Sequence, residues 1–255
     1  MLGTTGMRAT STVLALLVST ALLGACGGSG GSANTGGGAA AAGCAKGTAA
    51  KGNQLSVAAA PDGSVATTDG KCWTGIAPTT VTVADVGSGT PSGDSTWFKL
   101  AWSSKNLYIL TYTTEWPLSN AGGTNWWQSD TTEFDVSGTD DHAGAFTTGN
   151  QYQFGVVEDG TLQPGQNAPN ASPQPTPLVK IVPNKGFYTE LVVPWATLQV
   201  SKPAKGQKYQ FDLGQDYGDS SGARVAQIVW QADPSMASSS DWHADTSQWG
   251  DITLS

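Results

Sequence analysis

Three observations predict that this 255-residue chain folds as an all-β protein, an antiparallel β-sandwich. Apolar residues alternate with polar ones in short runs, and no long stretch repeats its apolar residues at the spacing of a helix. Glycine, asparagine, aspartate, serine and proline separate the runs. Many short strands joined by turns are typical of two packed sheets, so we expect one domain over residues 50–255.

The strands are expected in the following order. Residues 97–102 (WFKLAW) and 107–112 (LYILTY) flank a four-residue turn and should form a hairpin. The remaining strands are expected at 132–136, 152–157, 188–193, 209–213, 226–230 and 251–254. Residues 160–183 are rich in proline, glycine, asparagine and glutamine and predict a long loop. Residues 194–198 begin with proline and predict a short helical turn.

The N-terminus has the features of an export signal. Residues 1–25 contain an early arginine, an apolar run and then small residues. Residues 23–26 (LGAC) resemble the bacterial lipobox, which would make Cys26 the lipidated first residue of the mature chain. Residues 26–49 are rich in glycine and alanine and predict a flexible tether. We expect an exported protein held at the cell membrane or outer membrane, at the cell surface or in the periplasm.

Two cysteines remain after the signal, Cys44 and Cys72. In an oxidising compartment they predict one disulfide, and the alternative is a pair of free buried thiols. Lysine and arginine number 12 against 20 acids, a net charge of −8. This charge and the lack of a basic patch make nucleic acid a poor partner. Ten tryptophans among many glycine, serine and threonine residues favour a surface that meets neutral ligands.

The stretch NWWQSDTTEF at 125–134 is the strongest candidate for a binding site. On an unbroken strand, Trp127 and Glu133 would share one face, and Phe134 would face the core with Trp126. An exposed indole offers an apolar face to a sugar ring, and a carboxylate accepts hydrogen bonds from its hydroxyls. Gln153 and, in a polar loop, Trp242 are further candidates of the same kind.

Catalysis and metal chemistry have weaker signals. Glu133 with Asp130 or Asp135 could be taken for a glycosidase pair, but residues on one strand start from the same side of a scissile bond. No serine elbow, zinc-protease motif or phosphate-binding glycine loop is present. The turn with Asp140 and Asp141 could offer oxygens to calcium, or be a solvated acidic loop. A haem would need an axial pair such as Met236 with His142 or His243.

Six segments in order resemble a family 9 carbohydrate-binding module, known as an accessory domain of xylanases. They are TDGKCW (68–73), KNLYILTYTTE (105–115), WQSDTTEF (127–134), YTELVVPWATL (188–198), FDLGQDYGD (211–219) and the closing QWGDITL (248–254). The resemblance implies a jelly-roll sandwich. It also implies that Trp127 and Trp242 clamp a sugar ring while Glu133 hydrogen-bonds its hydroxyls.

The chain departs from the family where an arginine and an asparagine would meet the sugar, because Gln153 and Gly155 stand there. The resemblance also implies structural calcium, with Asp130, Asp140 and Asp141 as candidate ligands. We therefore expect a non-catalytic, monomeric, lipid-anchored protein that binds a glucan or xylan, and the resemblance implies binding at chain ends. The alternatives are a sandwich that binds haem or another small ligand, and a structural domain that docks a partner protein.

Overall fold

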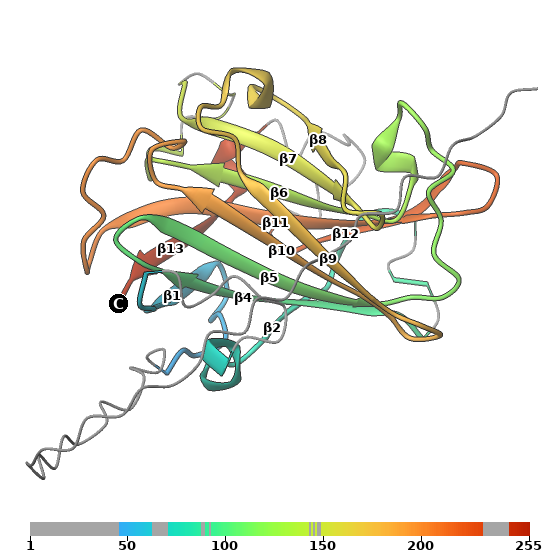
Figure 1. Cartoon of the computed structure of the whole chain (residues 1–255), viewed down its shortest axis with the longest axis horizontal. Helices are drawn as coiled ribbons and strands as arrows, with labels where there is room; N and C mark the ends of the chain where they lie inside the picture. The colour runs from blue at the N-terminus through green and yellow to red at the C-terminus, as the bar shows by residue number, and fades with distance from the viewer. Residues whose placement is uncertain are drawn as a thin grey trace, which may run out of the picture. The chain divides into compact units, whose positions relative to one another are not determined.

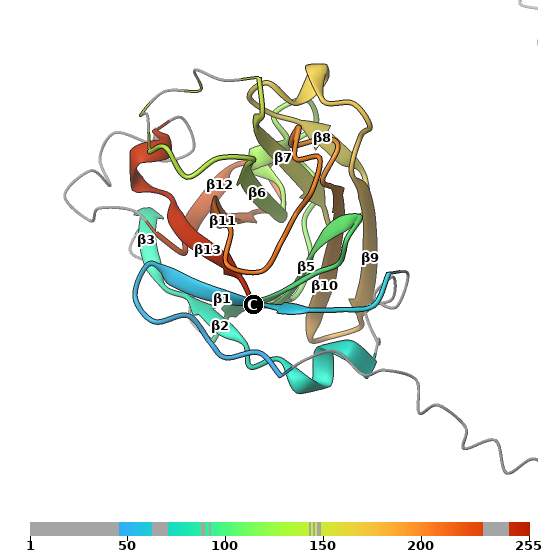
Figure 2. The same ribbon diagram turned by 90° about the vertical axis from the view of Figure 1, so that its left-hand side faces the viewer.

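The chain forms thirteen strands within the residues described by the computed structural model, which are 46–62, 71–87, 90–91, 93–142, 144, 146, 149–231 and 245–255. The two sheets face each other across a common core and are joined through strand β1 (Gln54–Ala59) (Figures 1 and 2). Four residues of β1 pair in parallel with one sheet, and its last two pair in parallel with the other. The all-β sandwich is confirmed.

One sheet, here called the β6 sheet, runs in the order β8-β7-β6-β11-β13-β1, and β12 and β3 extend it beside β11. Its strands other than β1 are β3 (Val83–Val86), β6 (Thr131–Ser137), β7 (Gln151–Val157), β8 (Leu162–Pro164), β11 (Lys208–Gly218), β12 (Arg224–Val229) and β13 (Gly250–Leu254). The neighbours β7, β6, β11 and β12 are all antiparallel. These four strands carry the candidate site.

The second sheet, the β5 sheet, runs in the order β1-β4-β5-β10-β9, with β2 beside β4. Its strands are β2 (Thr79–Val81), β4 (Ser95–Trp102), β5 (Asn106–Thr114), β9 (Thr176–Val182) and β10 (Gly186–Pro194). The hairpin expected at 97–112 is present as β4 and β5, and the backbone N–H of Ser103 donates to Asn106 in its turn.

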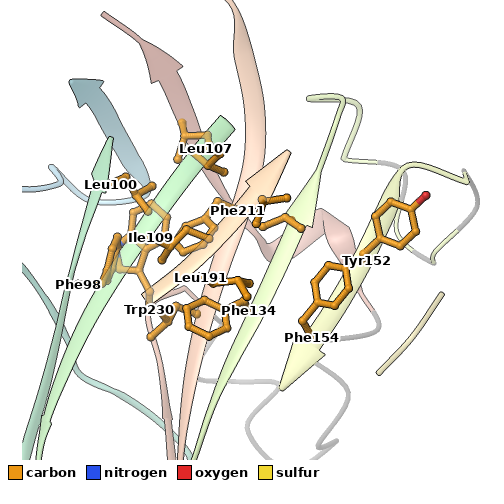
Figure 3. Packing of buried hydrophobic residues seen from close by; sticks show 14 of the residues in the cluster. Phe98, Leu100, Leu107, Ile109, Phe134, Tyr152, Phe154, Leu191, Phe211 and Trp230 are labelled. Atoms are coloured by element: carbon orange, nitrogen blue, oxygen red, sulfur yellow. The ribbon is translucent and has the colours of Figure 1, made fainter. Parts of the chain in front are cut away.

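The core between the sheets is built from the alternation that predicted the strands. Phe98 and Ile109 of the β5 sheet meet Phe134, Phe211 and neighbouring side chains of the β6 sheet (Figure 3). Each of these four side chains is excluded from water. Burial of apolar area contributes about 25 cal/mol per Å² and is the main force that holds the two sheets together.

Residues 160–183 differ from the loop expected there, whereas residues 194–198 contain a short hydrogen-bonded turn, as expected, although not a regular helix. Residues 160–183, expected as a loop, contain β8, a 3₁₀ turn (η3, Ala168–Asn170) and the edge strand β9. Two of its prolines, Pro164 and Pro177, lie in the edge strands β8 and β9, where a missing backbone N–H is tolerated. Residues 194–198 end β10 and continue as hydrogen-bonded turns, with no helix.

The other short elements are the 3₁₀ turns η1 (Lys71–Gly75), η2 (Trp126–Gln128) and η5 (Thr246–Gln248). The described residues fall within one compact unit, 40–255. No helix among them has the length and apolar character needed to cross a membrane. The signal segment, Cys26, most of the tether and Cys44 lie outside the described residues, as does the side chain of Cys72.

Candidate functional site

The outer face of the β6 sheet is polar although its side chains are largely closed off from water. Phe134 and Val136 point into the core, so Glu133 and Asp135 point outward from β6. Gln153 of β7 pairs with Asp135, and Asp212 of β11 pairs with it from the other side. A face that carries so many acceptors and donors needs specific partners to be stable.

Glu133 is the centre of this face. One carboxylate oxygen accepts a hydrogen bond from Nε2 of Gln153 at 2.8 Å, and the other accepts from Nε2 of Gln227 at 3.1 Å. The side chain is only 2% exposed. Oε1 of Gln153 accepts in turn from the backbone N–H of Gln166, which fixes the orientation of the Gln153 amide. Glu133 and Gln153, both expected from the sequence to meet a sugar, are therefore in direct contact with each other.

Gln227 is a site residue that the sequence did not single out. It lies on β12, two strands away from Glu133. Gly214 of β11 lies between the two strands and pairs with Glu133. Because Gly214 has no side chain, the amide of Gln227 can reach the Glu133 carboxylate. The alternation in residues 226–230 marks Gln227 as outward-facing. Only the pairing of β6, β11 and β12 shows what it faces.

The two adjacent tryptophans do not lie on the strand. Trp126 and Trp127 form the 3₁₀ turn η2, and β6 begins only at Thr131. Strand alternation therefore does not relate Trp127 to Glu133, and the inference that it places them on one face was wrong. Trp127 is nevertheless exposed, at 38%, whereas Trp126 is buried. Their rings meet edge to face with centroids 5.6 Å apart.

Trp126 connects the exposed indole to the polar face. A side chain at Gly155 would have its Cβ 2.5 Å from the Trp126 ring, so the ring lies directly against that glycine. Gly155 occupies an outward-facing position of β7 and is paired with Glu133 of β6. Trp126 is thus buried on the outer face and not in the core as expected. The absence of a side chain at residue 155 makes room for the indole.

Three further carboxyl groups extend the row on this face. Burial, with the nearby Glu133 and Asp212, raises the pKa of Asp135 well above its ordinary value. Burial likewise raises the pKa values of Asp212 and Asp216, although Arg224 donates to Asp216 at 3.0 Å and opposes the shift there. Neither oxygen of Asp135 has a hydrogen-bond donor within the described part of the chain. Because a raised pKa favours the protonated carboxyl group, this buried row can donate as well as accept hydrogen bonds.

The candidate calcium ligands do not come together. Asp130 immediately precedes β6, whereas Asp140 and Asp141 are exposed beyond its other end. A seven-residue strand separates its ends by roughly 20 Å. The carboxylate of Asp130 accepts from the backbone N–H groups of Ser119 at 2.5 Å and Gly218 at 2.7 Å. No group of three or more acids, histidines or cysteines that could hold a metal occurs among the described residues.

Asp130 instead fixes the segment that leads into η2. It lies in a cluster with Glu115 and Glu158, and burial is the main reason that the pKa values of all three are raised. For Glu158 the raised pKa is about 7. The hydroxyl of Thr131 donates to the carbonyl of Trp126, which adds a second tie between β6 and the tryptophan turn. These bonds hold Trp126 and Trp127 at the edge of the polar face.

Of the residues considered for haem, only His142 is described. Its Nε2 is 2.8 Å from Asp251, and its Nδ1 is 2.8 Å from the side-chain amide of Gln210. Both ring nitrogens are therefore engaged within the protein, which leaves neither for an axial bond. Met236, Trp242 and His243 lie outside the described residues.

The family described as carbohydrate family 9 binding domain-like matches residues 62–255. Endo-1,4-β-xylanase A of Thermoanaerobacterium saccharolyticum is 27% identical over 190 residues, which are 73% of this chain but 15% of the xylanase.

Solved structures show the same fold. A family 9 carbohydrate-binding module from Caldicellulosiruptor kristjanssonii in complex with glucose is 20% identical, with a TM-score of 0.60 over 72% of this chain and 86% of that one. For the complex with cellotriose, also 20% identical, the TM-score is 0.63 over 77% and 92%. A putative carbohydrate-binding protein from Bacteroides uniformis is 12% identical, with a TM-score of 0.53 over 80% of this chain and all of that one.

Proposed function

Because this chain belongs to the carbohydrate family 9 binding domain-like family, we propose that it binds carbohydrate without catalysis, on the outer face of the β6 sheet. Trp127 stacks on a sugar ring, with Trp242 as its partner on the opposite side. Glu133 and Gln153 hydrogen-bond the hydroxyls, and Gln227 joins them. A glucan or xylan chain end is the ligand expected from the family.

The observation that carries the proposal is the fixed orientation of Glu133 on a face that Trp126 connects to an exposed indole. Two amides hold the Glu133 carboxylate in one position. The Trp126 ring contacts both Gly155, which pairs with Glu133, and the ring of Trp127. A carboxylate held in this way can accept further hydrogen bonds without a large loss of side-chain entropy. The two structural neighbours with glucose and cellotriose are consistent with this class of ligand.

The same geometry disfavours a hydrolytic role. A glycosidase needs an acid and a base or nucleophile on opposite sides of the scissile bond, about 5–10 Å apart. Glu133 and Asp135 project from one face of one strand. The similarity to the xylanase covers 15% of that enzyme. We therefore propose a binding domain and no catalysis.

A fluorescence titration of the full chain tests the proposal. Cellobiose and xylobiose should quench tryptophan fluorescence saturably, and their reduced alditols should not if the site takes the ring at a reducing end. The variant Trp127→Ala should lose the response. The matched control is Trp116→Ala, which removes an indole that is also exposed, at 48%. No saturable response to any sugar would contradict the proposal.

Three further parts of the proposal concern attachment and stability. We propose that Cys26 carries the lipid that anchors the monomeric protein to a membrane, and that Cys44 and Cys72 form a disulfide. Mass spectrometry of the isolated protein, with and without reduction, tests both. Calcium binding stays a prediction, and a thermal melt with calcium against chelator tests it, because a bound ion stabilises the folded state by mass action.

A further inference from the structure

Asp216 of β11 lies on the same outer face as Glu133 and is fully excluded from water. Its neighbour Tyr217 points into the core, so the side chain of Asp216 points away from the core. Asp216 pairs with Thr131 of β6 on one side and with Gln227 of β12 on the other. It therefore lies between the strand that carries Glu133 and the strand whose amide donates to Glu133.

Arg224 reaches Asp216 because β12 is irregular at this point. The register of β11 and β12 shifts beyond the pair Tyr217 and Ala226, and Gly218 pairs with Arg224, so β12 contains one extra residue. Ala226 faces the core, and strict alternation would turn Arg224 the same way. A β-bulge re-aims the side chains beside it. Nη1 of Arg224 instead donates to Oδ1 of Asp216 on the outer face, at 3.0 Å.

The hydrogen bonds of Glu133 are those of an ionised carboxylate. One of its oxygens accepts from the amide of Gln153, and the other accepts from the amide of Gln227. An ionised carboxylate is an acceptor only, so it suits two N–H donors. A proton on Glu133 would compete with an amide for one of these two oxygens. Glu133 is therefore the acceptor in its contacts with neighbouring side chains.

The two oxygens of Asp216 have different surroundings. Oδ1 accepts from Arg224, whereas Oδ2 is buried and has no donor within the described part of the chain. The carboxyl group of Asp216 is within hydrogen-bond reach of the carboxyl group of Glu133. Two ionised carboxylates cannot form this bond, because both are acceptors. A proton on Oδ2 supplies the missing donor and also removes a buried, unpaired charge.

The charges around Asp216 favour the same state. It faces Glu133 from β6 and Arg224 from β12, and η2, which packs against β11 and β12, has no charged side chain. The other acids buried on or near this face are Asp85 of β3, Glu115, Asp130 and Glu158 at the start of β6, Asp135 of β6 and Asp212 of β11. Burial and then Glu133 raise the pKa of Asp216 well above its ordinary value, although Arg224 opposes the rise.

We propose that Asp216 carries a proton on Oδ2 and donates it in a hydrogen bond to Glu133, so that Asp216 and Arg224 are positioning residues of the carbohydrate site. Arg224 holds Oδ1, which turns Oδ2 toward Glu133. Three donors then surround the Glu133 carboxylate and keep it in one orientation for a sugar hydroxyl. When Asp216 loses its proton at high pH, two adjacent carboxylates repel each other and sugar binding weakens. The inference rests on the proposed function for the role of Glu133.

Asp216→Asn tests the protonation state without a sugar. An asparagine keeps an oxygen for Arg224 and an N–H group for Glu133, and it is uncharged at every pH. A protonated Asp216 keeps its proton in the folded chain above pH 3.8, whereas the unfolded chain loses it. The original chain therefore loses stability relative to the variant as pH rises. The midpoint of denaturant unfolding should be similar for both at pH 4 and higher for Asp216→Asn at pH 7.

An equal or lower midpoint for Asp216→Asn at pH 7 would overturn the inference, because it would show that Asp216 is an ionised partner of Arg224. The matched control is Asp219→Asn, which also removes one acid. The hydroxyl of Ser221, with nearby backbone N–H groups, lowers the pKa of Asp219. Its contribution to stability is present above pH 3.8 and is lost as pH falls. Asp219→Asn should therefore have the lower midpoint at pH 7, the opposite of Asp216→Asn.

Calorimetry with cellobiose tests the positioning role. At pH 7 the affinity of Asp216→Asn should be within twofold of that of the original chain, whereas Asp216→Ala, which has no donor, should bind at least fivefold more weakly. Arg224→Gln, which keeps a neutral donor, should bind more tightly than Arg224→Ala. From pH 6 to pH 9 the original chain should lose affinity and Asp216→Asn should not.

Equal losses in Asp216→Asn and Asp216→Ala would overturn the inference, as would identical pH profiles for Asp216→Asn and the original chain. The result is separate from that of the proposed function. If the original chain binds no sugar at any pH, the proposed function fails, and the midpoints at pH 4 and pH 7 still decide whether Asp216 is protonated.

Discussion

The six-membered ring of Trp126 occupies the space that a side chain on Gly155 would need, with the nearest ring carbon 2.5 Å from the position of a Cβ atom. This contact explains why a position that would offer a polar side chain to a sugar in the resembled family is a glycine here. Under the proposed function, the indole of Trp126 lines the site in place of that side chain. It also positions its neighbour Trp127, which it meets edge to face.

Gly155→Ala should therefore displace the tryptophan turn. The added methyl group cannot coexist with the ring at 2.5 Å, and overpacking of this kind costs roughly 1–3 kcal/mol. We expect a lower midpoint in chemical unfolding and weaker quenching by sugar. Gly149→Ala is the matched control, because its Cβ would lie 3.4 Å from the end of the Gln199 side chain and should be tolerated. Equal stability of the two variants would contradict this account of the turn.

Glu133→Gln should weaken sugar binding and also lower stability. Glu133 accepts hydrogen bonds from two amide groups, and a glutamine would turn an NH₂ group toward one of those donors. An unmatched buried polar group costs about 1–3 kcal/mol. Denaturant unfolding measures this loss. The double variant Glu133→Gln with Gln227→Glu returns an acceptor to the pair and should recover part of the stability. No recovery would indicate that the two side chains are not coupled.

Trp127→Ala should remove most of the sugar affinity and leave the fold intact. The side chain is 38% exposed and lies outside the core between the sheets, so little core area is lost. We expect at least a tenfold loss in affinity by calorimetry, equivalent to about 1.4 kcal/mol. Near-UV circular dichroism should retain its native form. A lost near-UV signal would mean that Trp127 is structural and that the stacking role is misassigned.

Glu190 should make the protein less stable as pH rises. Burial raises its pKa from 4.5 to about 8, and Trp73 opposes the shift in part. Above pH 4.5 the unfolded chain gives up this proton while the folded chain retains it until about pH 8. The contribution of Glu190 to stability is therefore present at low pH and is lost between pH 4.5 and 8.

Glu190→Gln mimics the protonated form and removes this dependence. The variant should match the original chain at pH 4.5 and exceed it at pH 8.5 by roughly 2–4 kcal/mol, measured by denaturant unfolding at the two pH values. Asp140→Asn, which removes an exposed carboxyl group, is measured beside it as a control for the loss of one acid. A variant that is less stable than the original chain at pH 8.5 would show that Glu190 is ionised in the folded state.

The alternation of residues within single strands determined much of the fold. Phe134 and Phe211 are core residues, as their spacing predicts, and each expected strand is present. The sequence also identified Glu133 and Gln153 as neighbours in function, and they are joined by a hydrogen bond. The strands and core residues follow from short-range periodicity, which a sequence displays directly. The pair Glu133 and Gln153 follows from motifs shared with a recognisable family.

Only the tertiary structure decided how distant segments combine. Gln227 belongs to the site because β12 lies two strands from β6, and Trp126 lies on the outer face because Gly155 leaves it room. Sequence spacing determines which way a side chain points along its own strand. The partners that it meets are set by strand order and register, which arise from packing of the whole domain.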